Sequence, residues 1–197
     1  MKPILFNTEM VRAILEGRKT VTRRCAFPNK DLRQFRESEW WFRGRVYPNW
    51  LSAMNGVQGV MSLCKYKPGD FLYVRETWVK SEDTFLYKAD DGAVSAWGWK
   101  PSIHMPKEAA RIFLRVKAVR VERLNDITIT GLQSEGIIPE GYISQYAAMA
   151  SQPYFDKFKA LWDSTIKPTD RDKYGWAANP WVWVIEFERC EKPEEGI

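Results

Sequence analysis

The sequence has few of the residues on which metal centres and disulfide frameworks are built. It contains one histidine, His104, and three widely spaced cysteines with no CxxC pair. Zinc sites draw on several cysteine and histidine ligands, so we expect no metal and no cofactor. An odd number of isolated cysteines favours a reduced, cytoplasmic protein. A catalytic triad would depend on His104 alone, and nothing near this residue in the sequence supports one.

The chain also lacks long apolar segments. Purely apolar runs such as WVWVI at 181–185 are far shorter than a membrane span. The N-terminal MKPILFNTEM becomes polar at once, so we expect neither a signal peptide nor a membrane partner. The chain has 197 residues, of which 45% are apolar. That size suits one well-buried core, and we predict a single domain over residues 1–197.

Positive charge, in contrast, is concentrated in one segment. Residues 11–45 hold 10 Lys and Arg against 4 Asp and Glu, a net charge of +6, whereas the whole chain carries +5. Aromatic residues are interleaved with these cations: Phe27, Phe35, Trp40, Trp41 and Phe42. A basic stripe with aromatic side chains suits single-stranded nucleic acid. A solvated charged surface is the alternative.

Apolar spacing outlines elements of both kinds. We expect a strand at 2–7, then a helix that Thr8 caps and Gly17 ends. Strand patterns follow at the ranges 71–78, 84–92, 111–124 and 181–188, and the third of them slips by one residue near Ala118, which predicts a bulge. These elements predict an α+β fold, a small mixed barrel with helices packed at its openings.

Three other segments complete this outline. Residues from about 25 to 66 show no sustained periodicity, so we expect an irregular, basic and aromatic insertion that could act as a lid. Thr130 and Gln133 form a capping box for a short helix. Pro153 can open a further helix with apolar residues on one face.

The segment GRKTVTRR at 17–24 places four cations around two threonines. Its first two cations follow a helix, whose dipole they complement. Neighbouring cations and any burial would lower the pKa of Lys19, whose neutral amine could then act as a base toward Thr22. On a straight strand these two side chains would point to opposite faces, so their contact requires a turn in the backbone. Arg23 and Arg24 are candidate phosphate contacts.

Glu135 is the second unusual residue. It lies in the last turn of the predicted short helix, where the helix dipole disfavours a carboxylate. This placement indicates a compensating cation or a functional use, and an exposed glutamate is the alternative.

These motifs, taken in order, resemble the ASCH family, in particular its longer members from phages and prophages. The resemblance rests on four stretches: ILEGRKTVTRR at 14–24, KPGDFLYVRETW at 67–78, RIFLRVKAVRVERL leading into DITITGLQSEGI at 111–137, and WVWVIEFE at 181–188. It covers most of the chain except residues 25–66 and about 140–155. It implies a PUA-like mixed β-barrel.

The resemblance also implies a reaction. Small bacterial ASCH members hydrolyse N4-acetylcytidine to cytidine and acetate, and their catalytic lysine, threonine and glutamate match Lys19, Thr22 and Glu135. We therefore expect a metal-independent amidohydrolase. Lys19 would act as a base on Thr22 or on a water, while Glu135 would orient Lys19 or protonate the leaving amine.

Other ASCH and PUA-like proteins are regarded as RNA-binding modules, and at least one is similar to a ribonuclease in activity. The function expected here is recognition of a modified base in a nucleoside or in single-stranded RNA, with hydrolysis of an N4-acyl group. The alternatives are a non-catalytic or ribonuclease-like RNA-binding module, and a phage protein that binds a host protein through tryptophans.

The YVRETW stretch and a later tryptophan supply further candidates for substrate binding. Arg75 and Glu76 alternate in direction after a strand, so one of them faces the barrel opening, or both belong to a structural ion pair. Trp78 and Trp99 could stack on a base or pack in the core.

Overall fold

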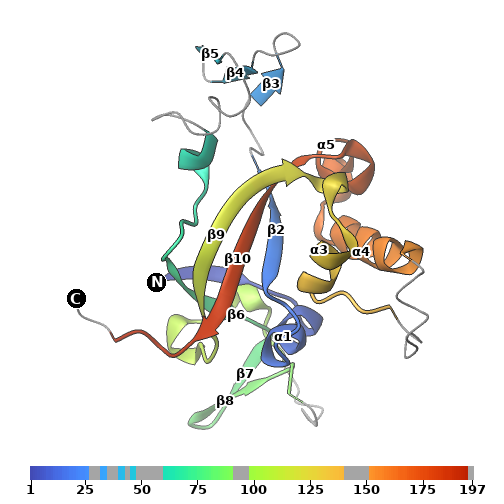
Figure 1. Ribbon diagram of the computed structural model, residues 1–197. Helices are drawn as coiled ribbons and strands as arrows, with labels where there is room; N and C mark the ends of the chain where they lie inside the picture. The colour runs from blue at the N-terminus through green and yellow to red at the C-terminus, as the bar shows by residue number, and fades with distance from the viewer. Residues whose placement is uncertain are drawn as a thin grey trace.

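The computed structural model describes residues 1–26, 60–90, 98–139 and 151–194, together with the backbone of three short strands between residues 32 and 47. The main element is a five-stranded sheet in the order β1-β6-β9-β10-β2 (Figure 1). β1 and β6 are parallel, and the other neighbours are antiparallel. The strands are β1 (Lys2–Leu5), β2 (Val21–Cys25), β6 (Phe71–Arg75), β9 (Phe113–Arg123) and β10 (Trp181–Cys190). With the helices described below, the sheet confirms the α+β class.

The two edges of this sheet, β1 and β2, come close to each other. Among the described residues no backbone ladder joins them. The side chain of Arg24 on β2 instead donates from Nη2 to the carbonyl oxygen of Leu5 on β1, at 2.6 Å. The sheet therefore curls far enough for one arginine to link its first and last strands.

β10 is buried on both faces, which explains its unbroken apolar sequence. Trp183 and Ile185 belong to a core cluster that also holds residues of helix α1 (Thr8–Leu15). Val182 and Val184 belong to a second cluster, with helices α3 (Ile129–Ser134) and α4 (Gln152–Thr165). Successive side chains of a strand point to opposite faces, so β10 forms part of both cores.

The predicted bulge near Ala118 is present. Glu186 of β10 pairs with Ala118, but Phe187 pairs with Val116, so Lys117 is an extra residue on β9. An extra residue reverses the alternation of side chains beyond it, which is the slip seen in the sequence.

The start of α1 differs from expectation by one residue. Its N-cap is Asn7, whose side-chain oxygen accepts a hydrogen bond from the backbone N–H of Met10 at 2.8 Å. Thr8, the predicted cap, is the first helical residue. Asn7 has the extended backbone that a cap requires, and its short amide reaches the third helical N–H.

The start of α3 also lies earlier than predicted. Its N-cap is Thr128, which accepts from the backbone N–H of Gly131 at 3.1 Å, so the predicted Thr130–Gln133 capping box is wrong. The helix ends at Ser134 with Glu135 as its C-cap, and Gly136 follows with a positive φ of 81°. The helix ending at Gly136 is therefore confirmed.

α4 forms with Pro153 in its first turn, and it buries Phe158 and Trp162 against the second cluster. The strand expected at 71–78 breaks after Arg75. Trp78, the last residue of that expected strand, instead begins the hairpin of β7 (Trp78–Ser81) and β8 (Thr84–Tyr87). A short helix, α5 (Arg171–Tyr174), precedes β10.

The insertion contains a small antiparallel sheet in the order β3-β4-β5. Its strands are β3 (Leu32–Gln34), β4 (Trp40–Phe42) and β5 (Arg45–Tyr47). These strands are too short to give a recognisable alternation, so the expectation of irregular structure is wrong for them. The lid expected of this insertion falls largely on residues outside the described ones.

Candidate functional site

Lys19 and Glu135 form a buried ion pair where α1 runs into β2. The Lys19 Nζ lies 2.5 Å from Glu135 Oε2 and donates a second hydrogen bond to the Glu135 carbonyl at 3.0 Å. Both side chains are almost wholly inaccessible to solvent, at 0% and 3% exposed. The backbone holds them there, because the N–H of Thr20 donates to the carbonyl of Ser134. Lys19 and Glu135 themselves form an isolated β-bridge.

Gly136 permits this approach. A Cβ on Gly136 would lie 2.7 Å from the Cβ of Ala13 and 3.1 Å from that of Lys19. The positive φ of Gly136 also belongs to the left-handed region that glycine adopts without strain. The end of α3 can therefore lie directly against α1 and the residue that carries the ammonium.

Arg23 extends the pair into a ladder of alternating charges. Its Nη1 lies 3.1 Å from Glu135 Oε1, while Nη2 and Nε contact Glu122 Oε1 at 2.7 and 2.9 Å. Glu122 in turn contacts Arg120, which is half-exposed. The ladder runs from the surface to Lys19, and the guanidinium of Arg23 is occupied on both sides within the protein. Arg23 therefore does not face solvent as a phosphate contact would.

Burial lowers the pKa of Lys19, as expected from the sequence. Loss of hydration is the largest cause, since it disfavours the charged amine. Glu135 opposes this effect, and Arg24 and Arg23 add to it. The pair thus combines an amine that loses its proton more easily than an ordinary lysine with a carboxylate positioned to receive one.

Thr22 and Glu135 line one cavity of about 240 Å³ between β2 and α4. Its polar side is formed by β2, and the opposite wall is apolar, with Met10, Phe158, Leu161 and Trp162. A cavity with one apolar wall and a few polar groups is the usual form of a small-molecule site.

The Thr22 hydroxyl is available to a ligand. The residue is 1% exposed, and its hydroxyl has no hydrogen-bond partner within the part of the chain that the structure describes. No hydrogen bond joins Lys19 to Thr22 there, and Lys19 does not line this cavity. Glu135 lines the cavity in front of Lys19, so it is the charged member of the predicted catalytic set in contact with the open space.

Arg24 lines the cavity beside Thr22, and its guanidinium is turned toward β1. Besides its bond to Leu5, its guanidinium lies 5.2 Å from the ring centre of Phe6. The Lys19 ammonium lies 5.6 Å from the same ring centre. Phe6 thus contacts both cations, and Arg24 raises the local positive potential that lowers the pKa of Lys19.

The candidates around YVRETW lie apart from this cavity. Glu76 is buried and takes two hydrogen bonds from Arg111, at 2.9 and 3.0 Å. Arg75 donates to the carbonyl of Ile103. Trp78 packs in a small core cluster with Met105. None of these residues, nor the half-buried Trp99, is among those that line the cavity beside Thr22.

The basic stripe seen in the sequence is partly turned inward. Of its ten cations, the five whose side chains the structure describes are Arg12, Arg18, Lys19, Arg23 and Arg24. Each has a hydrogen bond or ion pair within the protein. These five serve the fold and the site rather than an open polyanion surface.

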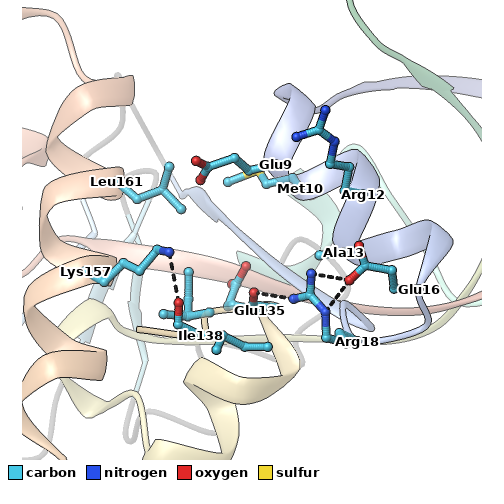
Figure 2. A pocket seen from close by; sticks show the side chains of 12 residues that line it. Glu9, Met10, Arg12, Ala13, Glu16, Arg18, Glu135, Ile138, Lys157 and Leu161 are labelled. Atoms are coloured by element: carbon cyan, nitrogen blue, oxygen red, sulfur yellow. Dashed lines mark hydrogen bonds and ion pairs between the residues drawn. The ribbon is translucent and has the colours of Figure 1, made fainter. Parts of the chain in front are cut away.

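Figure 2 shows the residues that line a second cavity, of about 180 Å³, which adjoins the first. Met10, Glu135 and Leu161 line both, so the two cavities meet at these residues, and together they are called the groove between α1 and α4. Sequence reasoning missed the α4 side of this groove, because Phe158, Leu161 and Trp162 share a helical face that reads as ordinary core packing. The sequence shows the helical spacing of these residues, but it does not show that they also form a wall of the cavity.

Metal-binding clusters and membrane-spanning helices are absent from the described residues. No group of three or more His, Cys, Asp or Glu lies close enough there to hold a metal ion. No helix in those residues combines the length and the apolar character needed to cross a membrane.

Comparisons with known proteins give fold-level likenesses. No model of a protein family matches the chain, and no curated protein does. The chain is similar to a crystal structure of an Enterococcus faecalis V583 protein of family DUF984, with 11% identity over 100% of this chain and 87% of that chain, at a TM-score of 0.38. It is also similar to an ASCH domain from Lactobacillus crispatus JV V101, with 13% identity over 90% of this chain and 67% of that chain, at a TM-score of 0.35. What this site does is therefore inferred from its own residues.

Proposed function

We propose that the cavity between β2 and α4 binds a modified base and that the protein removes an N4-acyl group from cytidine without a metal. The observation that supports this most is the meeting of Thr22 and Glu135 in one cavity, with Lys19 held 2.5 Å behind the carboxylate. The three residues are those that the resemblance to ASCH proteins assigns to amide hydrolysis. The proposal treats residues 1–197 as a single domain, because β10 contributes to both apolar clusters.

The apolar wall suits the base. Phe158, Leu161 and Trp162 present flat or aliphatic surfaces across the cavity from Thr22. Aromatic and aliphatic side chains bind the faces of a planar ring, and polar groups at its edge fix its orientation. An acylated pyrimidine held in this way would direct its exocyclic amide toward the Thr22 hydroxyl and the Glu135 carboxylate.

The reaction is a hydrolysis that consumes one water. Glu135 takes the proton of the attacking hydroxyl, either a water or Thr22, as the oxygen bonds to the acyl carbon. The bond from that carbon to N4 breaks, and the proton passes to N4, so that cytidine leaves as the amine. If Thr22 attacks, a water then releases the acyl group from it as a carboxylic acid. Lys19 holds the carboxylate in position, and the lowered pKa of Lys19 allows it to share the proton.

The test is to incubate the purified protein with N4-acetylcytidine and to follow cytidine by chromatography. Thr22→Val keeps the shape of a buried side chain and removes the hydroxyl, and Glu135→Gln removes the charge. Thr20→Val is the matched control, since Thr20 is exposed and lies outside the cavity. We expect wild type and Thr20→Val to form cytidine at similar rates, and the other two variants to be slower by about 100-fold or more.

Each result has a definite meaning. Loss of activity in Glu135→Gln alone would assign the attack to water. Full activity in both site variants would exclude the proposed mechanism. No cytidine with the wild type would exclude N4-acetylcytidine as the substrate.

A further inference from the structure

The groove continues beyond the base-sized cavity, and its second half has a different character. The cavity beside α1 is lined by six charged side chains, three cationic and three anionic: Glu9, Arg12, Glu16, Arg18, Glu135 and Lys157. It is therefore balanced in charge, unlike a groove that follows a nucleic-acid backbone.

Most of these charges are already engaged. Arg18 is paired with Glu16 and donates to the carbonyl of Gly136. Arg12 donates to the carbonyl of Ala89, and Glu135 is held by the ladder. Arg12, Glu16 and Arg18 therefore shape the cavity and have little left to offer a ligand, while Glu135 serves the reaction proposed above.

Two side chains remain that can bind one. Glu9 has no partner within the described residues, and Lys157 makes a single bond, from Nζ to the carbonyl of Ile138 at 2.9 Å. They come from α1 and α4 and project into the cavity from different walls (Figure 2). A carboxylate and an ammonium across one cavity can accept from and donate to hydroxyl groups, whereas a phosphate could pair only with the ammonium and would be repelled by the carboxylate.

From this arrangement we infer that the cavity beside α1 takes the neutral sugar of a nucleoside, and that Glu9 excludes the phosphorylated form. The inference rests on the proposed function, since the base must occupy the adjoining cavity for the sugar to lie here. The shared lining residues Met10, Glu135 and Leu161 mark where the base would continue into its sugar. Glu9 and Lys157 are then the residues that set specificity.

The experiment measures binding and does not depend on turnover. Cytidine and cytidine 5′-monophosphate are titrated into the full-length protein by calorimetry. Variants Glu9→Gln and Lys157→Gln change the groove charge in opposite directions. Glu188→Gln is the control, because it removes an exposed carboxylate on β10 that does not line either cavity.

We expect wild type to bind cytidine about tenfold more tightly than the monophosphate. Glu9→Gln should narrow this ratio several-fold, Lys157→Gln should widen it, and Glu188→Gln should leave it unchanged. Equal or tighter binding of the monophosphate, or a ratio that Glu9→Gln does not change, would overturn the inference. If N4-acetylcytidine is nevertheless hydrolysed, the proposed function stands without it. If neither cytidine nor its monophosphate binds, the inference is wrong, and the groove is not a binding site for cytidine.

Discussion

Lys19 and Glu135 lie 116 residues apart in the sequence and share a buried ion pair whose Nζ–Oε2 distance is 2.5 Å. The backbone joins them as well, through the bond from Thr20 N–H to Ser134 O. The pair therefore connects the edge of the sheet to the end of α3. Glu135 lines the cavity of the proposed site, and Lys19 lies behind Glu135.

Glu135→Ala should lower the free energy of unfolding by about 3–5 kcal/mol, because it leaves the ammonium of Lys19 buried without its anion. Lys19→Met and the double variant complete a cycle, with unfolding followed in urea. The double variant should cost about 1–3 kcal/mol less than the two single costs together, since it leaves no unpaired charge at this position. Additive costs would show that the two residues do not stabilise each other.

Gly136→Ala should destabilise the protein by more than its backbone conformation alone explains. A Cβ there would approach the Cβ of Ala13 to 2.7 Å, so α1 and α3 would have to separate. Gly69→Ala is the matched control, because Gly69 has a similar positive φ of 88° and open space around its Cβ position. We expect Gly136→Ala to cost about 1–3 kcal/mol more than the control in thermal or urea unfolding. Equal costs would mean that the helices are not tightly packed here.

The lowered pKa of Lys19 predicts a pH dependence of stability. Between that pKa and the ordinary value of 10.5, the unfolded chain binds a proton that the folded chain does not. Stability due to this group should therefore rise with pH across that window. The free energy of unfolding of wild type, minus that of Lys19→Met, should increase with pH by at most about 1.4 kcal/mol per unit.

The control for this slope is Lys117→Met, measured over the same pH range. The Lys117 side chain is 60% exposed, and its ammonium stays in water, so the corresponding difference should show no such rise. A flat curve for Lys19→Met as well would contradict the effect of burial on its amine.

Glu76→Gln tests whether the second charged cluster belongs to the site. Glu76 is buried, and burial raises its pKa against the opposing effect of Arg111. Because it does not line the cavity beside Thr22, the variant should keep the rate of cytidine formation within about twofold while losing stability of about 1–3 kcal/mol. Asp90→Asn removes the more exposed partner of Arg111 and should cost less. A rate loss as large as that of Thr22→Val would return Glu76 to the substrate site.

Local sequence patterns predicted many features of the fold. Gly17 ends α1, Lys117 forms the bulge where the alternation slips, and Phe158 and Trp162 share the buried face of α4. Each of these features depends on neighbours within a few residues, where the conformation of the backbone and the spacing of apolar side chains decide the outcome. Even where the predicted N-caps of α1 and α3 were wrong, the observed caps lie only one and two residues away.

By itself, the sequence determined the residue types of the site and the elements that carry them. Lys19, Thr22 and Glu135 could be singled out, and a lowered pKa for Lys19 could be expected. Tertiary structure alone decided that Glu135 lines the cavity in front of Lys19, that Arg23 is occupied by two carboxylates, and that α4 supplies the opposite wall. These relationships join segments about a hundred residues apart, and local spacing contains no information about which segments pack together.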